Sequence, residues 1–136
     1  MKEHLPSAYK AILNSAINKC EEMIDGCQTI DDKCSTGAEL ECAKQLGICI
    51  NVANDCIDLC KKAVEQCQDH LQECDDPVCI TRNKEAMGAA DTCILACEKL
   101  IISCRTGRRQ CIDSELEAIK RCSECAKAFY RCLQEA

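Results

Sequence analysis

Apolar and polar positions recur along most of the chain with the period of an α-helix. Between residues 42 and 74, cysteines seven or four residues apart fall on one face, within roughly 40° at about 100° per residue. Aliphatic side chains such as Leu46 and Val64 flank this face, whereas Asp55 and Glu65 lie on the opposite side. The pattern predicts an amphipathic helix whose apolar stripe is centred on sulfur.

The cysteine stripe recurs elsewhere in the chain, which indicates duplicated helical units. The spacing C-x3-C-x6-C-x6-C begins at Cys56 and again at Cys93, and weaker copies begin at Cys20 and Cys125. A single helix cannot bury such a stripe by itself, so four units of about one helix each are expected to pack together. We find no alternating strand pattern and no low-complexity linker between them.

Residues typical of helix ends set the bounds of the predicted helices. Thr36 and Ser114 are each followed three residues later by glutamate, the spacing of a capping box, and Asp76 precedes Pro77 as an N-cap precedes a first-turn proline. Gly107 is expected to end the third helix. The signals predict helices near 7–33, 37–74, 77–105 and 115–135.

These boundaries leave Cys111 on a loop, and the long second helix could break near Gly47. Because the connections are short, neighbouring helices should run antiparallel. The expected fold class is therefore all-α, with residues 1–136 forming one domain. Its architecture is an antiparallel up-down four-helix bundle with a cysteine-lined core.

Composition narrows the class of protein. The chain has 136 residues with 17 cysteines, five glycines and two prolines, which argues against a loop-rich, disulfide-knotted miniprotein. Its net charge of −6 argues against non-specific nucleic-acid binding, and no apolar run approaches the length of a membrane span. The first residues lack the features of a signal peptide, so we expect a cytoplasmic protein with nearly all its thiols free.

Four interpretations of the cysteine stripes compete. Packing of thiols as small hydrophobes explains one or two buried cysteines but not four stripes of them. Interhelical disulfides fit the heptad spacing, although the number of cysteines is odd and no export signal is visible. An iron–sulfur or zinc site has only the Cys122-x-x-Cys125 pair as a local ligand spacing. The fourth interpretation is a thiolate store for several ions of a soft monovalent metal.

The charge of the buried cysteines favours the thiolate store for a soft monovalent metal. Burying thiolates that no cation neutralises destabilises the fold by many kcal/mol. A zinc ion with four thiolates leaves two net negative charges, whereas Cu(I) selects thiolate and neutralises the core near one ion per cysteine. Cysteines seven residues apart are separated by about 10.5 Å along the axis and must share ions with facing helices, which predicts stacked sites along a channel. Those four apart, at about 6 Å, are predicted to hold an ion within one helix, as in Cys56 with Cys60 and Cys93 with Cys97.

The sequence therefore predicts storage or buffering of multiple Cu(I) ions, with ligation and no catalytic turnover. The alternatives are a structural bundle cross-braced by interhelical disulfides and a thiol redox buffer. A protein that donates or accepts copper is the expected macromolecular partner, with no nucleic acid and no membrane. The predicted ligands are Cys20, Cys27, Cys34, Cys42, Cys49, Cys56, Cys60, Cys67, Cys74, Cys79, Cys93, Cys97, Cys104, Cys111, Cys122, Cys125 and Cys132.

The C-x3-C pairs and their surroundings resemble the copper storage proteins, a family of cysteine-lined four-helix bundles. The resemblance rests on residues 55–60 (DCIDLC), 91–97 (DTCILAC) and 122–127 (CSECAK), and it covers most of residues 20–132. It implies Cu(I) bound inside the bundle by cysteines, and often a homotetramer. This chain has fewer C-x2-C pairs, more heptad gaps and a longer second helix than the family pattern.

His70 is added to the predicted metal ligands through the same resemblance. Family members often carry histidine or methionine at the bundle mouth where copper enters, and His70, near the end of the second helix between Cys67 and Cys74, resembles that position. The competing interpretation is a boundary histidine in contact with solvent. Met23 and Met87 fall near cysteine faces, where a methionine is more often core packing than a ligand.

Overall fold

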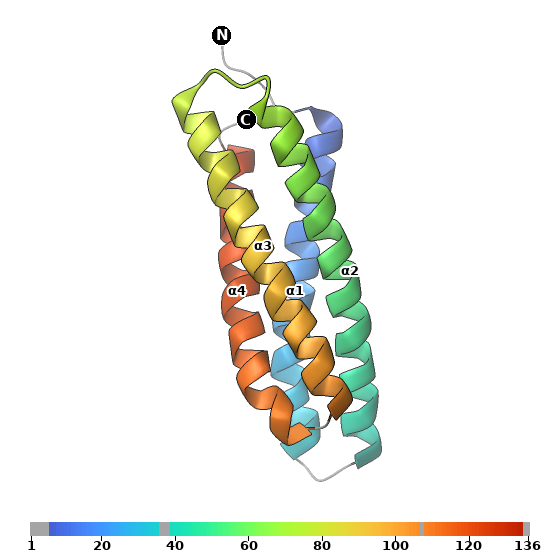
Figure 1. Cartoon of the computed structure of the whole chain (residues 1–136). Coiled ribbons are helices and arrows are strands. Elements are labelled where there is room, and N and C mark those ends of the chain that lie inside the picture. The colour runs from blue at the N-terminus through green and yellow to red at the C-terminus, as the bar shows by residue number, and fades with distance from the viewer. Residues whose placement is uncertain (1–5, 36–38, 107, 135–136) are drawn as a thin grey trace.

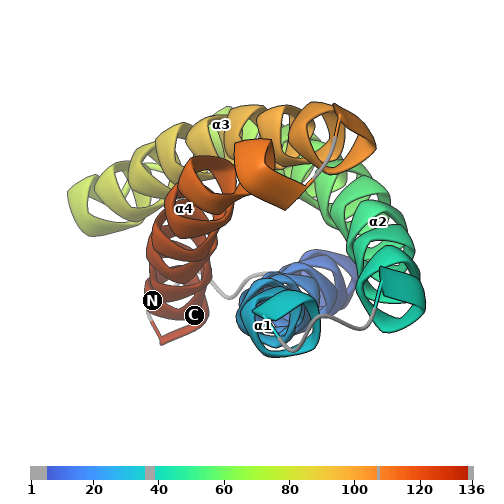
Figure 2. The ribbon, with the colours of Figure 1, turned by 90° about the horizontal axis from the view of Figure 1, so that it is seen from below.

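The computed structural model describes residues 6–35, 39–106 and 108–134, which form four long helices (Figure 1). The helices are α1 (Ser7–Ser35), α2 (Glu39–Leu71), α3 (Pro77–Thr106) and α4 (Arg108–Gln134). Each helix packs against the next, and α4 packs against α1, so the described helices surround one core in chain order (Figure 2). The predicted all-α, antiparallel up-down bundle is confirmed.

The two faces of α2 are those that the periodicity predicts. Its stripe cysteines Cys49, Cys56, Cys60 and Cys67 are buried in the bundle. The polar positions of the opposite face are all exposed: Asn51, Asp55, Asp58, Lys62, Glu65 and Asp69. Helical period alone therefore directs sulfur inward and charge outward.

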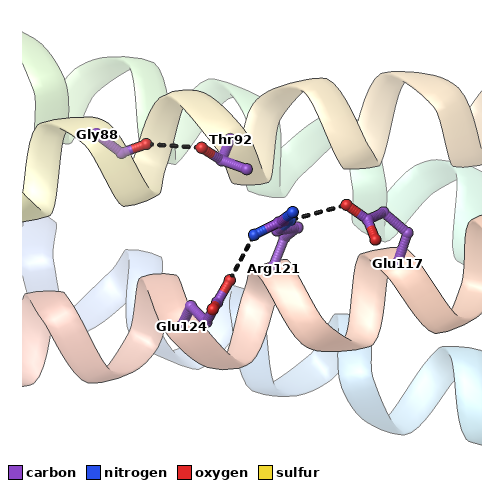
Figure 3. Close-up of polar contacts among 5 residues, drawn as sticks. All are labelled: Gly88, Thr92, Glu117, Arg121 and Glu124. Atoms are coloured by element: carbon purple, nitrogen blue, oxygen red, sulfur yellow. Dashed lines mark hydrogen bonds and ion pairs between the residues drawn. The ribbon is translucent and has the colours of Figure 1, made fainter.

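Charged side chains pair with one another on the outer surface. The Arg121 guanidinium donates to Glu117 at 2.8 Å and to Glu124 at 3.0 Å, all on α4, while the Thr92 hydroxyl donates to the Gly88 carbonyl on α3 (Figure 3). Within the described residues no lysine or arginine side chain is buried. The described lysines and arginines are therefore all at least partly exposed, and Arg82 lies close enough to Cys132 to act on it electrostatically.

The helix ends around α2 differ in detail from the predicted ones. The helix ends at Leu71, so Cys74 lies in the connection to α3 and not in the helix. The chain passes Gly47 without a break. The predicted start of α3 is confirmed, because the Val78 backbone N–H donates to the Asp76 carboxylate at 2.9 Å. The predicted cap at Thr36 lies outside the described residues.

The predicted start of the fourth helix is wrong. α4 begins at Arg108, one residue after Gly107, and runs through Ser114 without a boundary. The Ser114 hydroxyl is 2.7 Å from the Ser103 hydroxyl of α3, so it is engaged across the helix pair instead of capping a helix. Cys111 consequently lies in a helix and not on a loop, and its side chain is outside the described residues.

The core combines sulfur with few large apolar side chains. Tyr9, Leu13, Met23, Leu100 and Phe129 are fully buried among the cysteines and alanines. Of the helices described, none is both long enough and apolar enough to cross a lipid bilayer.

Candidate metal centre

Seven cysteine side chains meet in the middle of the bundle, and every helix contributes at least one. All seven have no solvent-exposed surface. The period of each helix turns these cysteines to its buried face, and the packing of the four helices brings them to one level. We call this group the central thiol layer: Cys20, Cys56, Cys60, Cys93, Cys97, Cys122 and Cys125.

Two overlapping sets of four sulfurs lie within this layer. In each set the four Sγ atoms are within 4.8 Å of one another, and each helix supplies one of them. Cys20 and Cys93 belong to both sets. The sets are Cys20, Cys56, Cys93 and Cys122, and Cys20, Cys60, Cys93 and Cys125.

The sulfur separations match those of metal thiolates. The Cys93 and Cys122 Sγ atoms are 3.5 Å apart, and the Cys20–Cys56 and Cys60–Cys125 pairs are 3.9 and 4.0 Å apart. Metal–sulfur bonds of about 2.3 Å in a tetrahedral site place sulfurs about 3.8 Å apart. The same spacing suits hydrogen-bonded thiols, so the layer accommodates protons or metal without moving the backbone.

The two members of each intrahelical pair do not enter one four-sulfur set together. Cys56 and Cys60 enter different four-thiol sets, and Cys97 enters neither, although its Sγ lies 4.0 Å from that of Cys122. The four-sulfur sets therefore draw their ligands from different helices, whereas the sequence interpretation paired neighbours on one helix. The side chains of each pair still interact through a hydrogen bond, and ion binding within one helix stays a prediction.

Hydrogen bonds inside the layer shift the pKa values of its thiols in opposite directions. Bonds from Cys122 and Cys125 lower the pKa of the Cys93 thiol, because they stabilise its thiolate. The pKa of Cys97 is raised, first through its hydrogen bond to Cys122. Equally buried thiols of one layer therefore differ in how readily they lose their protons.

Apolar side chains separate the central thiol layer from the two ends of the bundle. Leu13 and Phe129 lie on one side, and Met23 and Leu100 on the other, each with at most 1% of its surface exposed. Leu13 precedes Cys20 by seven residues, which is about 10.5 Å along the helix. These side chains belong to the same core as the cysteines, and the stacked sites along a channel stay a prediction. Met23 is core packing, as predicted.

A second group lies toward the end where α1 meets α2. The pKa of Cys27 is raised by a hydrogen bond to Cys49, by burial and by the negative charge of Glu115, with Cys104 also near. Glu115 is buried, whereas the sequence interpretation placed the carboxylates on solvated faces. Its position seven residues before Cys122 is the signal that would have placed it on the cysteine face.

At the same end, the sulfurs of Cys34 and Cys42 form a disulfide between α1 and α2. These two predicted ligands are not thiols in this structure. The fourteen other cysteines that the structure describes are thiols outside any disulfide.

A third group lies at the opposite end, where α2 leads into α3. The ligand atoms of His70, Cys74 and Cys79 are within 4.8 Å of one another, and His70 Nε2 is 3.2 Å from Cys79 Sγ. His70 is 8% exposed, so it is buried against sulfur and not a solvent-facing boundary residue. The structure thus brings together residues of the helix end, the connection and the next helix.

Two further thiols, Cys67 and Cys132, line the interior side of this third group. Burial raises the pKa of Cys67 to about 11, although its hydrogen bond with the Tyr9 hydroxyl, whose oxygen is 2.8 Å from the sulfur, opposes the shift. Burial likewise raises the pKa of Cys132 to about 12, and its thiol donates to the Arg82 carbonyl at 3.2 Å. Both are therefore protonated near neutral pH, and metal must displace their protons.

Comparisons with protein-family models, with curated proteins and with solved structures find no match for this chain.

Proposed function

We propose that the protein binds and stores several Cu(I) ions through the thiolates of the central thiol layer. The observation that carries the proposal is the sharing of Cys20 and Cys93 by two four-sulfur sets. A thiolate common to two sets is placed to bridge two ions, and bridging thiolates build clusters of several ions. A single structural site needs no shared ligand.

Charge supports a monovalent ion. The six sulfurs of the two sets lie in a fully buried layer, and no buried lysine or arginine accompanies them in the described residues. Two divalent ions on six thiolates leave two net negative charges in this environment. Cu(I) is soft, selects thiolate and is able to fill the layer until the charge is neutralised.

The surroundings of the thiols support ligation without turnover. A catalytic thiol needs access to substrate, whereas the central thiol layer is closed by Leu13, Phe129, Met23 and Leu100. The surface hollow between α2 and α3, next to Val64 and Leu95, contains no cysteine. A store of this kind exchanges copper with a donor or acceptor protein, and the resemblance to copper storage proteins adds a homotetramer to the proposal.

A thiol redox buffer is the second candidate, and the Cys34–Cys42 disulfide favours it. That bond lies at one end of the bundle, however, while the sulfurs of the central thiol layer are free. A redox buffer uses thiols that reach solvent, which these do not.

The test is a Cu(I) titration of anaerobically reduced protein against a competing chromogenic chelator. If the protein stores copper, each chain should bind several Cu(I) ions. Their binding should release protons, because the thiols are protonated at pH 7. Saturation at one ion per chain would contradict the proposal. A titration of protein whose thiols have been alkylated under denaturing conditions gives the background.

A further inference from the structure

The group at the end of the bundle differs chemically from the central thiol layer, because it combines one imidazole with two thiols. We infer that His70, Cys74 and Cys79 form a separate site for a borderline divalent ion such as Zn(II), with a fourth position open to solvent. This site goes beyond the proposed Cu(I) store and does not depend on it.

The three ligands come from ten consecutive residues that the fold holds in place. The Glu73 backbone N–H donates to the His70 carbonyl at 3.1 Å, which turns the chain at the end of α2. The Asp76 cap fixes the start of α3, and Cys79 lies in its first turn. Zinc bonds of about 2.0 Å to nitrogen and 2.3 Å to sulfur need ligand atoms about 3.5 Å apart. The 3.2 Å between His70 Nε2 and Cys79 Sγ is close to this value.

The charge of this group suits a divalent ion. Two thiolates and a neutral imidazole cancel the charge of Zn(II), whereas Cu(I) on the same ligands leaves one negative charge. The central layer differs, because several Cu(I) ions are able to neutralise the six thiolates of its two sets, whereas one Zn(II) in each set leaves two net negative charges. Imidazole is also a common ligand of Zn(II). The group at the end of the bundle therefore favours Zn(II), whereas the central thiol layer favours Cu(I).

A second ring of contacts orients the ligands, as expected around a metal site. The Asn83 side-chain amide donates to Cys79 Sγ at 3.4 Å and to the Cys79 carbonyl at 2.8 Å. The Tyr9 hydroxyl donates to Asn83 Oδ1, which sets the amide with its NH2 toward sulfur. The Tyr9 ring also lies 5.7 Å from the His70 ring, tilted by 52°. This arrangement accounts for a buried asparagine that core packing does not explain.

Access separates this site from the central thiol layer. Cys79 is partly exposed, and Cys74 lies in the irregular connection between α2 and α3, whereas the central sulfurs are fully buried. Three protein ligands leave a fourth tetrahedral position for water. An ion here joins the end of α2, the connection and the start of α3, so it stabilises that end of the bundle.

The test uses reduced full-length protein with one equivalent of Zn(II) and no copper. We expect zinc X-ray absorption to show two sulfur ligands with nitrogen or oxygen completing the shell. Competition with a chromogenic chelator should show at least about tenfold weaker binding in Cys74→Ser and in His70→Gln. Cys97→Ser, a buried thiol outside both four-thiol sets, is the matched control and should bind the ion as the unchanged protein does.

Cys74 lies outside the helices, so Cys74→Ser should leave the bundle intact, and circular dichroism checks this for each variant. First-equivalent zinc bound by four sulfurs, or unchanged affinity in both Cys74→Ser and His70→Gln, would overturn the inference. The two proposals are separable by a Cu(I) titration of the double variant, which should retain the ions of the central thiol layer. A chain that takes up zinc at its end but stores no copper would contradict only the proposed function.

Discussion

At the residue scale, two cysteines one turn apart on α3 have different surroundings. Cys93 and Cys97 are both fully buried, but Cys93 belongs to both four-thiol sets and Cys97 to neither. The pKa of Cys93 is lowered by hydrogen bonds from facing thiols, whereas that of Cys97 is raised. Equal burial on the same helix face therefore does not imply equal participation in metal binding.

This difference predicts unequal losses of copper. Cys93→Ser should remove about two Cu(I) ions per chain because its thiolate bridges both sets, while Cys97→Ser should remove about one at most. Both changes replace a buried thiol on α3 with a hydroxyl, so each controls for the other. Chelator competition on the reduced proteins measures the capacity, and equal losses would show that Cys93 is not a shared ligand.

The buried thiols also predict how stability depends on pH. The pKa of Cys67 is raised from 9.0 to about 11, so the folded chain keeps a proton that the unfolded chain loses as pH rises above about 9. The contribution of Cys67 to the free energy of unfolding is therefore complete below pH 9 and declines as pH rises through 11. Urea unfolding of reduced, metal-free protein should show a lower midpoint at pH 10.5 than at pH 8. A smaller decline is expected in Cys67→Ala, and an unchanged midpoint in the parent protein would contradict the prediction.

At the scale of elements, α2 remains one helix because its buried face is continuous. Cys49, Ala53 and Cys56 lie on the core side just after Gly47, and packing of this face outweighs the weak helix propensity of one glycine. The same reasoning explains α4, which begins close to Gly107 because nothing between Arg108 and Ser114 breaks a helix. Packing of a continuous buried face thus outweighed the local helix-breaking signal at Gly47 and the local helix-start signal at Ser114.

Glycine substitutions test this balance within the helices. A Cβ at Gly47 meets no atom within 4 Å, so Gly47→Ala should raise the free energy of unfolding by about 0.5–1 kcal/mol. At Gly26 the Cβ would lie 3.1 Å from Cys49 Sγ, so Gly26→Ala should gain less or destabilise. Urea unfolding of the reduced proteins compares them. A loss of stability in Gly47→Ala would show that the helix is strained at that residue.

At the scale of the whole molecule, thiol layers alternate with apolar layers. Leu13, Met23, Leu100 and Phe129 are buried in the same core as the cysteines and bury apolar surface without metal. Neutral thiols are themselves small, weakly polar core residues. The bundle therefore has a hydrophobic core that is independent of ligation.

It follows that the reduced, metal-free protein should already be helical and should gain thermal stability with Cu(I). An ion that binds only to the folded state adds about 4 kcal/mol to the free energy of unfolding when its free concentration is a thousandfold above its dissociation constant. Circular dichroism melts with and without Cu(I) measure both effects, and Cys93→Ser should gain less than the parent chain. A random-coil spectrum of the reduced, metal-free chain would instead indicate metal-dependent folding.

The sequence by itself determined the fold class and the direction of each face. Heptad and C-x3-C spacing return cysteines to one side of a helix, so burial of that stripe and exposure of Asp55 and Glu65 follow from helical geometry alone. The start of α3 at Pro77 was also local, because Asp76 caps it with its own side chain. These features depend on residues within a few positions of one another.

Only the tertiary structure decided which sulfurs meet. Periodicity gives an angle around each helix but not the axial offset between helices, and that offset depends on the connections and on how facing side chains interlock. It brings Cys20 beside Cys93, assigns Cys56 and Cys60 to different sets, and buries Glu115 near Cys27. The contacts that define the candidate metal sites join residues far apart in the chain or across a turn, so no local pattern could fix them.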